Sequence, residues 1–395
     1  MARRGVPPGS QSSLREANRA RVVESLKRHG RLTQVELAGS TGLSPATVSN
    51  IVKELAASGI LHTSVTSRSG RRATLVSLAR QVGLVAGVHF SSRHLRIAIA
   101  DATRTIVSQS TLPLALDHRA DAELERLTLL LSDMMESLGG SVADLHAIGL
   151  AVPAPVDPHT GMVSTVGLLR GWEGVDIAKS LTLRIGRPVY VDSEANLGGL
   201  AEAREGAARE AASSVFIRAG HTISAGLVVG GDLFHGVNGK AGQIGHVTLD
   251  ENGPICRCSN RGCLETFAGG PALLSLFPPG EGMQRLSDLL SAAEAGDSRS
   301  RRVIADAGRH IGIAAASLCN LLDPALIVMG GELAQAGEIL MAPMRHSLER
   351  TALPSTAGLP EIVATSFGEW AEVRGAIAVA LDHVSVDAGA VPITA

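Results

Sequence analysis

Aromatic residues and cysteines are scarce in this chain of 395 residues, which contains 2 Trp, 1 Tyr, 6 Phe and 4 Cys. Four cysteines in a chain of this length do not form the disulfide framework of a small secreted domain. No apolar run approaches the ~20 residues that a membrane-spanning helix needs, and the first 25 residues lack the apolar segment of a signal peptide. We therefore expect a cytoplasmic protein that does not bind membranes.

The composition excludes a disordered chain or a coiled coil, because 45% of the residues are hydrophobic and 19% are charged. At ~150 residues per domain, the length predicts two or three domains. Residues 1–80 hold 13 Lys and Arg against 4 Asp and Glu, whereas the rest of the chain holds 23 against 34. A basic module attached to an acidic domain favours nucleic acid as the partner, although a solvated basic face gives the same count.

The first 80 residues carry the signals of three successive helices. After a tail at 1–16, the first helix ends at Gly30. The second begins at Thr33, with Glu36 at the spacing of a capping box. The third begins after Ser44, an N-cap residue followed by proline at the first helical position. Two helices joined by a short turn that contains glycine predict a helix-turn-helix.

The third helix has one apolar face, formed at i, i+3, i+4 and i+7 by Val48, Ile51, Val52 and Leu55. The opposite face carries short and polar side chains that fit a DNA major groove. Asn50 is suited to reading adenine, and Ala46 and Thr47 are suited to contacting a thymine methyl group. Because the helix contains no arginine, we expect an A·T-leaning half-site.

Residues 60–66 and 72–78 alternate between apolar and polar side chains on either side of a turn at 67–70, which predicts a hairpin with arginines at its tip. Three helices and a basic hairpin predict a winged helix-turn-helix over residues 17–80, with wing arginines on phosphates or in the minor groove. The candidate DNA-binding residues are Ser44, Ala46, Thr47, Asn50, Lys53, Arg68, Arg71 and Arg72. A three-helix module that binds another protein is the alternative.

From about residue 82, short β-branched runs alternate with helical patterns, as in an α/β domain. Within this region one histidine precedes a group of three cysteines. Three thiolates and one imidazole complete the tetrahedral shell of a zinc ion and leave no open position. We predict a structural zinc site formed by His246, Cys256, Cys258 and Cys263. Chance clustering or a redox role is the alternative.

The segment Ala241–His246, followed by Cys-x-Cys-x4-Cys-Leu-Glu ending at Glu265, resembles the signature of the ROK family, which groups sugar-responsive repressors, sugar kinases and uncharacterised proteins. Segments that agree with this resemblance are 149–153, 171–172 and 323–331. The resemblance covers residues 82–382. It implies an α/β architecture with two lobes of the actin-like (ribonuclease H-like) kinase type and a ligand cleft between them. Family members with an N-terminal helix-turn-helix are regulators.

By this resemblance, a small lobe comprises residues 82–193 and 374–395, and a large lobe with the zinc loop comprises residues 194–373. The residues implied in sugar binding are Gly171, Ser193, Glu194, Gln243, His246 and Glu265. Carboxylates and an imidazole suit vicinal hydroxyls, which both donate and accept hydrogen bonds. Because Gln243 stands where the family usually has glutamate, a degenerate pocket of satisfied polar residues is the alternative.

Three departures from the family's kinases argue against catalysis. The first strand ends in the sequence His-Phe-Ser-Ser-Arg at 89–93 instead of Asp-x-Gly-Gly-Thr, so a carboxylate and two glycines are missing. Residues 220–224 lack two glycines of the second phosphate loop, and Glu194 replaces the aspartate base. Phosphoryl transfer needs backbone N–H groups around the phosphates and a well-placed base. We therefore expect no kinase activity.

These features together predict a homodimeric or homotetrameric transcription regulator, a repressor of carbohydrate genes that binds a pseudo-palindromic operator on double-stranded DNA. A sugar or sugar derivative would close the two lobes and lower the operator affinity. Two rivals stay open: a sugar kinase with a DNA-binding appendage, and a regulator with a vestigial pocket that responds to a protein partner.

Overall fold

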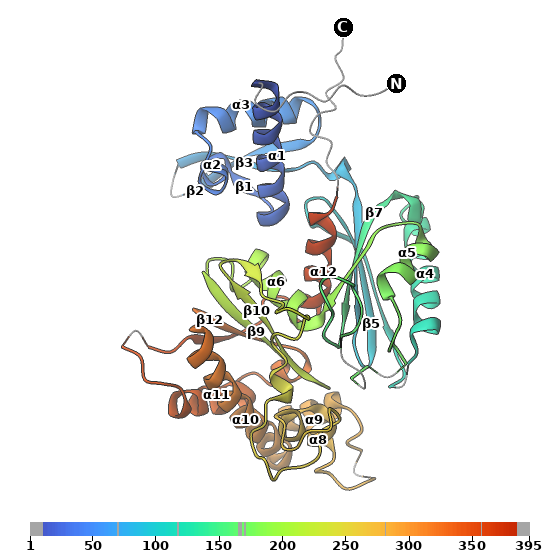
Figure 1. The fold of residues 1–395 in the computed structure, drawn as a ribbon, viewed down its shortest axis with the longest axis vertical. Coiled ribbons are helices and arrows are strands. Elements are labelled where there is room, and N and C mark those ends of the chain that lie inside the picture. Colours follow the sequence, from blue (N-terminus) through green and yellow to red (C-terminus); the bar gives the residue numbers. More distant parts are fainter. Residues whose placement is uncertain are drawn as a thin grey trace.

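The computed structural model describes residues 11–68, 71–116, 118–164, 168–169, 171–280, 282–356 and 358–384. Within these residues the strands form three sheets, one of three strands and two of five. Figure 1 shows the three-stranded sheet with its helices at one end of the molecule and the two larger sheets beyond it. Within the same residues, every helix is too short or too polar to cross a bilayer.

The N-terminal domain has the predicted three helices and hairpin. Its elements are α1 (Gln11–His29), β1 (Leu32–Thr33), α2 (Gln34–Thr41), α3 (Pro45–Ala57), β2 (Leu61–Arg68) and β3 (Arg71–Leu78). The predicted capping box is present, because the Thr33 hydroxyl accepts from the N–H of Glu36 and the Glu36 carboxylate accepts from the N–H of Thr33. Strand β1, which the sequence analysis missed, pairs with β3 and completes the sheet.

Helix α1 is longer than predicted. It begins at Gln11, so residues 11–16 of the predicted tail are helical, whereas the rest of that tail lies outside the described residues. The side chains of Arg15 and Arg19 pair with Glu54 on α3. These ion pairs hold the first half of α1 against α3. The tail was predicted from composition, which contains no information on such contacts.

The hairpin also extends further than predicted. Strand β2 continues to Arg68, where Ser67 pairs with Arg72 and Arg68 with Arg71. The two strands therefore continue up to the tip, and the predicted turn loses its first two residues to the sheet. Residues 69 and 70, which join the strands, lie outside the described residues.

The small lobe is built on the first five-stranded sheet. Its strands are β4 (Leu84–Phe90), β5 (His94–Asp101), β6 (Ile106–Pro113), β7 (Leu145–Val152) and β8 (Val189–Ser193). They lie in the order β6-β5-β4-β7-β8. Strand β5 pairs antiparallel with both β4 and β6, whereas β7 pairs parallel with both β4 and β8. Helices α4 (Ala120–Ser137) and α5 (Ile177–Ile185) bury their apolar sides against one face of this sheet.

The large lobe repeats the same topology. Its strands are β9 (Ser213–Ala219), β10 (Ile223–Val229), β11 (Asp232–Leu233), β12 (Leu326–Gly330) and β13 (Glu361–Ala364), in the order β11-β10-β9-β12-β13. Its outer helices are α7 (Glu265–Ala268), α8 (Gly270–Leu274), α9 (Leu286–Glu294), α10 (Ser298–Leu322) and α11 (Glu338–Thr351). A repeated five-stranded unit of this order confirms the predicted two-lobed actin-like architecture.

Helices α6 (Glu194–Glu205) and α12 (Ala371–Asp382) lie between the two sheets and pack against each other (Figure 1). The contact is close at Gly375, where a Cβ atom would lie 1.8 Å from the carbonyl oxygen of Leu197. The lobe limits expected at 193/194 and 373/374 fall at the start of α6 and within the first turn of α12.

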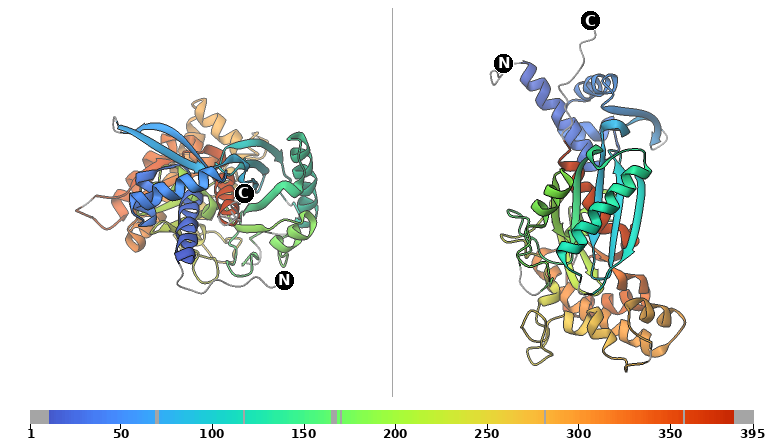
Figure 2. Two further views of the ribbon diagram at one scale, coloured as in Figure 1. Left: turned by 90° about the horizontal axis from the view of Figure 1, so that it is seen from above. Right: turned by 90° about the vertical axis from the view of Figure 1, so that its right-hand side faces the viewer.

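Helix α12 also joins the lobes to the N-terminal domain. Its side chains Ile377 and Leu381 belong to one continuous cluster of buried apolar residues with Val22, Val23 and Leu26 of α1. The right-hand view of Figure 2 shows the N-terminal domain directly against the lobes along the long axis. The N-terminal domain and the lobes therefore share a hydrophobic core at the contact between α1 and α12.

Candidate DNA-binding surface, metal cluster and effector site

Helix α3 presents the predicted contact residues to solvent. Its apolar face is buried, as predicted for Val48, Ile51, Val52 and Leu55. Ala46, Asn50 and Lys53 are exposed and Thr47 is half-buried. The hydroxyl of Ser44 accepts from the N–H of Thr47 at 3.2 Å and so caps the helix. The exposed face is therefore held in place at its N-terminus and available to a DNA groove.

Helix α1 widens this surface, which the sequence analysis missed. A groove of about 470 Å³ between α1 and α3 is lined by Leu14, Arg15, Asn18, Thr47, Asn50, Ile51, Lys53 and Glu54. Arg19 Nη2 lies 2.6 Å from a carboxylate oxygen of Glu54, and Arg15 pairs with the other oxygen. Hydrogen bonds from these two guanidinium groups hold the pKa of Glu54 below its usual value. The carboxylate on α3 is thus neutralised by α1.

The three wing arginines lie at the tip of the hairpin. Arg72 is exposed on β3. Arg68 ends β2 and Arg71 begins β3, and the side chains of both lie outside the described residues. Their part in DNA binding therefore stays a prediction.

The four predicted metal ligands come together. The ligand atoms of His246, Cys256, Cys258 and Cys263 all lie within 4.8 Å of one another. His246 belongs to a short 3-10 helix after the large-lobe hairpin, and the cysteines follow in the next loop. The cluster is therefore a candidate site for one metal ion.

Two distances test the fit of zinc to this cluster. Cys256 Sγ lies 3.5 Å from His246 Nδ1, and Cys258 Sγ lies 3.7 Å from Cys263 Sγ. With Zn–S at about 2.3 Å and Zn–N at about 2.1 Å, a tetrahedron separates sulfur from nitrogen by about 3.6 Å and sulfur from sulfur by about 3.8 Å. Burial lowers the pKa of His246, which favours the neutral imidazole that binds metals. The arrangement fits a tetrahedral ion.

Four of the predicted sugar-binding residues line one small cavity between the lobes. These are Ser193, Glu194, Gln243 and His246, joined by Thr222, Ser224 and Arg257. The cavity measures about 10 Å³, which holds no more than one water molecule. Gly171 is not among its described lining residues; its carbonyl accepts from the N–H of Ala120 at the start of α4.

Glu265 lies beside this cavity and is already engaged. Its carboxylate accepts from Arg257, a residue between the first two cysteines of the metal cluster, with 2.6 Å from Nε to Oε1. It also accepts from the N–H of Ile223 at 3.3 Å. Arg257 has no signal in the sequence for this role, because its contact with Glu265 depends on how the loop folds back.

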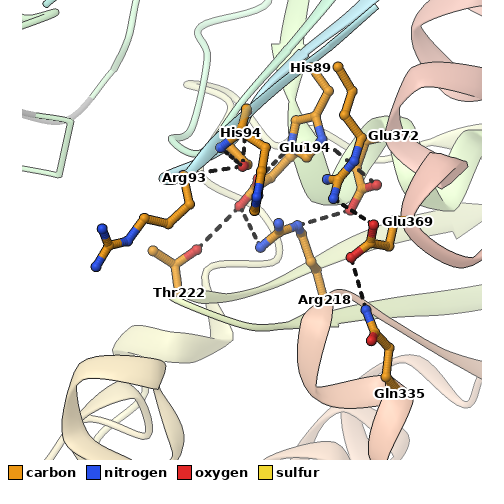
Figure 3. Close-up of polar contacts among 11 residues, drawn as sticks. His89, Arg93, His94, Glu194, Arg218, Thr222, Gln335, Glu369 and Glu372 are labelled. Atoms are coloured by element: carbon orange, nitrogen blue, oxygen red, sulfur yellow. Dashed lines mark hydrogen bonds and ion pairs between the residues drawn. The ribbon is translucent and has the colours of Figure 1, made fainter. Parts of the chain in front are cut away.

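A cluster of buried charges surrounds Glu194 (Figure 3). One of its carboxylate oxygens lies 2.9 Å from Nε2 of His89, and the other lies 3.1 Å from Nη1 of Arg218 and 3.2 Å from the hydroxyl of Thr222. Arg218 Nε donates to Glu372 at 2.9 Å. His89, Glu194, Arg218 and Glu372 are each at most 4% exposed. Each oxygen of the Glu194 carboxylate therefore already has at least one polar partner inside the protein.

The opposite charges of this cluster stabilise each other in their ionised forms. Burial alone would raise the pKa of Glu194, but the Arg218 guanidinium and the hydrogen bond to His89 outweigh burial and hold that pKa below its usual value. Burial would likewise lower the pKa of Arg218, but Glu194 and Glu372 raise it. Glu194 and Arg218 are therefore ionised at neutral pH inside the protein.

Further contacts extend the cluster across the start of α12. Glu369, just before α12, accepts from Gln335 of the large lobe at 2.9 Å (Figure 3). It also accepts from Arg96 of β5 at 2.7 Å. With Glu372 already bound by Arg218, the first turn of α12 is held from both lobes. Any change in the distance between the lobes must alter these contacts.

The C-terminal end of α1 contacts both lobes. The Arg104 guanidinium, from the turn after β5, donates to the carbonyl oxygens of Lys27 and Arg28 and pairs with Glu205 of α6 at 2.8 Å. Arg28 pairs in turn with Asp232 of β11 in the large lobe. The DNA-binding domain is thus connected to each lobe through the last residues of α1.

Comparison with known proteins places the two parts of the chain. A model of the ROK family matches residues 85–383, and a model described as winged helix-turn-helix DNA-binding matches residues 15–61. The chain belongs to the ROK family. This confirms the resemblance drawn from the Ala241–His246 segment and the cysteine spacing, and it confirms the winged helix at the N-terminus.

Relatives in this family include repressors and a kinase. The chain is 24% identical to the xylose repressor of Bacillus subtilis over 375 residues, which covers 94% of this chain and 97% of that protein. It is 28% identical to the transcriptional dual regulator NagC of Escherichia coli over 366 residues, covering 88% and 89%. A glucokinase of Halalkalibacterium halodurans is 33% identical over 251 residues, covering 60% and 76%.

Solved structures show the same fold. A ROK family transcriptional regulator described as a homologue of the E. coli MLC protein has a TM-score of 0.74, at 23% identity, and the match covers 94% of this chain and 96% of that chain. A ROK family glucokinase from Streptomyces griseus, in complex with glucose and AMPPNP, has a TM-score of 0.68 at 24% identity and covers 75% of this chain. The N-terminal winged helix-turn-helix and the repressor relatives confirm the predicted class, a DNA-binding regulator of the ROK family.

Proposed function

We propose that this ROK-family protein is a cytoplasmic repressor of carbohydrate-use genes whose operator affinity falls when a sugar binds between its lobes, and that it has no kinase activity. The observation that carries the proposal is the attachment of α1 to both lobes through Arg28 and Arg104. A ligand that changes the angle between the lobes must move α1, and with it α3. The ligand acts only if it binds the rearranged state more tightly than the DNA-competent state.

The DNA contacts are assigned to α3 and the wing. Asn50 reads an adenine, Ala46 and Thr47 contact thymine methyl groups, and Lys53 contacts a phosphate. Ser44 positions the helix as its N-cap, and the wing arginines Arg68, Arg71 and Arg72 lie on phosphates or in the minor groove. Two such domains in a homodimer or homotetramer fit a pseudo-palindromic, A·T-leaning operator.

The metal ion of the cluster is zinc in this proposal, held by His246, Cys256, Cys258 and Cys263. Four protein ligands leave no position for a substrate, so the ion is structural. Its chemical contribution is to fix the loop that carries Arg257 and Glu265. The sugar hydroxyls then meet Glu194, Gln243, His246 and Glu265, whereas Ser193 caps α6 and lines the same cavity.

The kinase alternative conflicts with the charges around Glu194. A general base must take up a proton readily, which the lowered pKa of Glu194 disfavours, and a transferred phosphate needs an uncrowded anion site. Here the carboxylate is bound by His89, Arg218 and Thr222, and the His89 side chain stands where the family's kinases have an aspartate. A glucokinase is among the relatives, so kinase activity is tested directly below.

The experiment is affinity selection of fragmented genomic DNA from the source organism by the purified full-length protein, followed by sequencing. We expect a short palindrome upstream of sugar transport or catabolic genes. The selected duplex is then titrated with protein in the presence of D-xylose, D-glucose or N-acetylglucosamine, and one of them should lower the affinity. Variant Asn50→Ala serves as the binding-deficient control.

Three outcomes contradict parts of the proposal. Recovery of unselected DNA means that the basic domain binds only phosphates. A palindrome whose affinity no sugar alters favours a protein signal over a sugar effector. ADP release from ATP with any of these sugars, abolished by Glu194→Ala, would establish the kinase.

A further inference from the structure

Arg257 lies between the metal-cluster residues Cys256 and Cys258 and closes the site proposed for the sugar. Its Nε and Nη2 atoms donate to the two oxygens of Glu265 at 2.6 and 3.3 Å. Its Nη1 atom donates to the carbonyl oxygen of Leu168 at 2.9 Å. The guanidinium thus connects the metal loop with the small-lobe segment between β7 and α5.

Two cavities meet at this side chain. The inner cavity of about 10 Å³ contains Glu194, Gln243 and His246. An outer groove of about 390 Å³ is lined by His221, Pro254, Ile255, Cys256, Arg257, Glu265, Thr266, Pro271, Ala272 and Ser275. Among the described residues, Arg257 is the one that lines both spaces. It forms the wall between a solvent-accessible groove and the polar residues of the effector site.

Arg257 occupies acceptor positions on Glu265 that the hydroxyl groups of a sugar would use. The bidentate guanidinium and the N–H of Ile223 together occupy three of the four acceptor positions of the Glu265 carboxylate, so a single position, on Oε1, is left for a hydroxyl group. Within the described lining of the outer groove, Glu265 is the single carboxylate. An Arg257 side chain released into that groove therefore finds no second acidic partner there, and its closed position is favoured.

We propose that Arg257 is the gate and a specificity-determining residue of the effector site, where its guanidinium competes with the hydroxyl groups of a neutral sugar for Glu265. This inference rests on the proposed sugar-binding function of the inner cavity. The main chain at Arg257 is fixed on both sides by metal ligands, so the site opens by rotation of one side chain away from Glu265 and Leu168. Sugar affinity then includes the cost of breaking these three hydrogen bonds.

The test compares the zinc-loaded full-length protein with Arg257→Ala and with Arg261→Ala. Arg261 lies in the same loop with the same charge, is exposed, and is not among the described residues that line either cavity. Zinc content, measured for each protein, shows that the loop is intact. Calorimetry with D-xylose, D-glucose and N-acetylglucosamine should show a Kd about 10-fold lower for Arg257→Ala, because charge-assisted hydrogen bonds no longer oppose binding. Arg261→Ala should bind as the wild type does.

A ligand-free measurement keeps the gate separate from the sugar. Hydrogen exchange of the Ile223 amide, which donates to Glu265, should be at least several-fold faster in Arg257→Ala and unchanged in Arg261→Ala. A weaker sugar affinity in Arg257→Ala would mean that Arg257 contacts the ligand, and the gate would be wrong. Unchanged affinity with unchanged exchange also refutes it. If none of the proteins binds a sugar, the proposed effector fails, and the exchange rates alone decide whether Arg257 closes the cavity.

Discussion

Replacing Arg218 by methionine should destabilise the two lobes strongly. The guanidinium lies between Glu194 and Glu372, at 3.1 and 2.9 Å, and its side chain is 5% exposed. Methionine keeps most of the volume but leaves two buried carboxylates with His89 as the only basic partner among the described contacts. Removing one partner of a buried ion pair costs about 3–5 kcal/mol. At about 2 °C per kcal/mol for a large domain, the melting temperature should fall by roughly 6–10 °C.

The stability lost in Arg218→Met should depend on pH. In the wild type the pKa of Glu194 is held below its usual value, so its contribution to stability is present above pH 4.5 and is lost as the pH falls through the lowered pKa. Without Arg218, burial raises that pKa, so the penalty is smallest in acid and grows as the pH rises through the raised value. The difference in melting temperature between wild type and Arg218→Met should therefore widen from pH 5 to pH 8.

Calorimetry of the full-length protein measures this effect. Arg184→Met, an exposed arginine on α5, is the matched control and should change the stability by less than about 0.5 kcal/mol. Adding Glu372→Gln to Arg218→Met removes the excess charge and should restore at least about 2 kcal/mol. A fall of less than about 1 kcal/mol at pH 8, or a loss that does not vary with pH, would refute the reasoning about the buried charges.

Three further predictions concern the metal, the DNA surface and a histidine. Cys258→Ser should lose the zinc, seen by elemental analysis, and lower the melting temperature while binding to random DNA persists; zinc retained at full occupancy would contradict the ligand set. Lys53→Ala should reduce the slope of log affinity against log salt by about 1 at every sequence, whereas Asn50→Ala should cost about 1–3 kcal/mol at the operator only; equal losses on both DNAs would contradict these roles. The hydrogen bond from His235 to Asp192, 2.7 Å long, raises the pKa of His235, so its stabilising effect is full below pH 6.5 and is lost as the pH rises through the raised value. The gap in melting temperature between wild type and His235→Gln should narrow from pH 6 to pH 8.5, and a constant gap would show that the charge plays no part.

The elements that could be predicted from the sequence are those with local signals. The cap at Ser44 and the apolar stripe of α3 lie within one helix, and the structure has both. The metal cluster was also predictable, because three of its four ligands lie within eight positions. Helix α6 has a weaker local signal, because Gly198 and Gly199 lower helix propensity by about 1 kcal/mol each. Their presence is explained by the fold: a Cβ atom at Gly198 would lie 2.3 Å from the ring of Phe216.

The contacts that complete the candidate site could not be predicted in this way. Arg218 and Glu372 are 154 positions apart, and each alone is an ordinary charged residue in an apolar strand or helix. The hydrogen bonds of Arg257 likewise depend on the return of the metal loop to Glu265 and Leu168. Periodicity and spacing contain no information on pairings that arise only when the two lobes meet.

The shared core of α1 and α12 limits how this protein can be divided. Val22, Val23 and Leu26 are buried together with Ile377 and Leu381, so a DNA-binding domain cut away after the wing would expose part of its own interior. A domain exchanged with that of a relative would place a foreign α1 on an α12 surface shaped for this one. The two surfaces must therefore change together, and transplanted domains should keep regulation only when the facing side of α12 is transplanted with them.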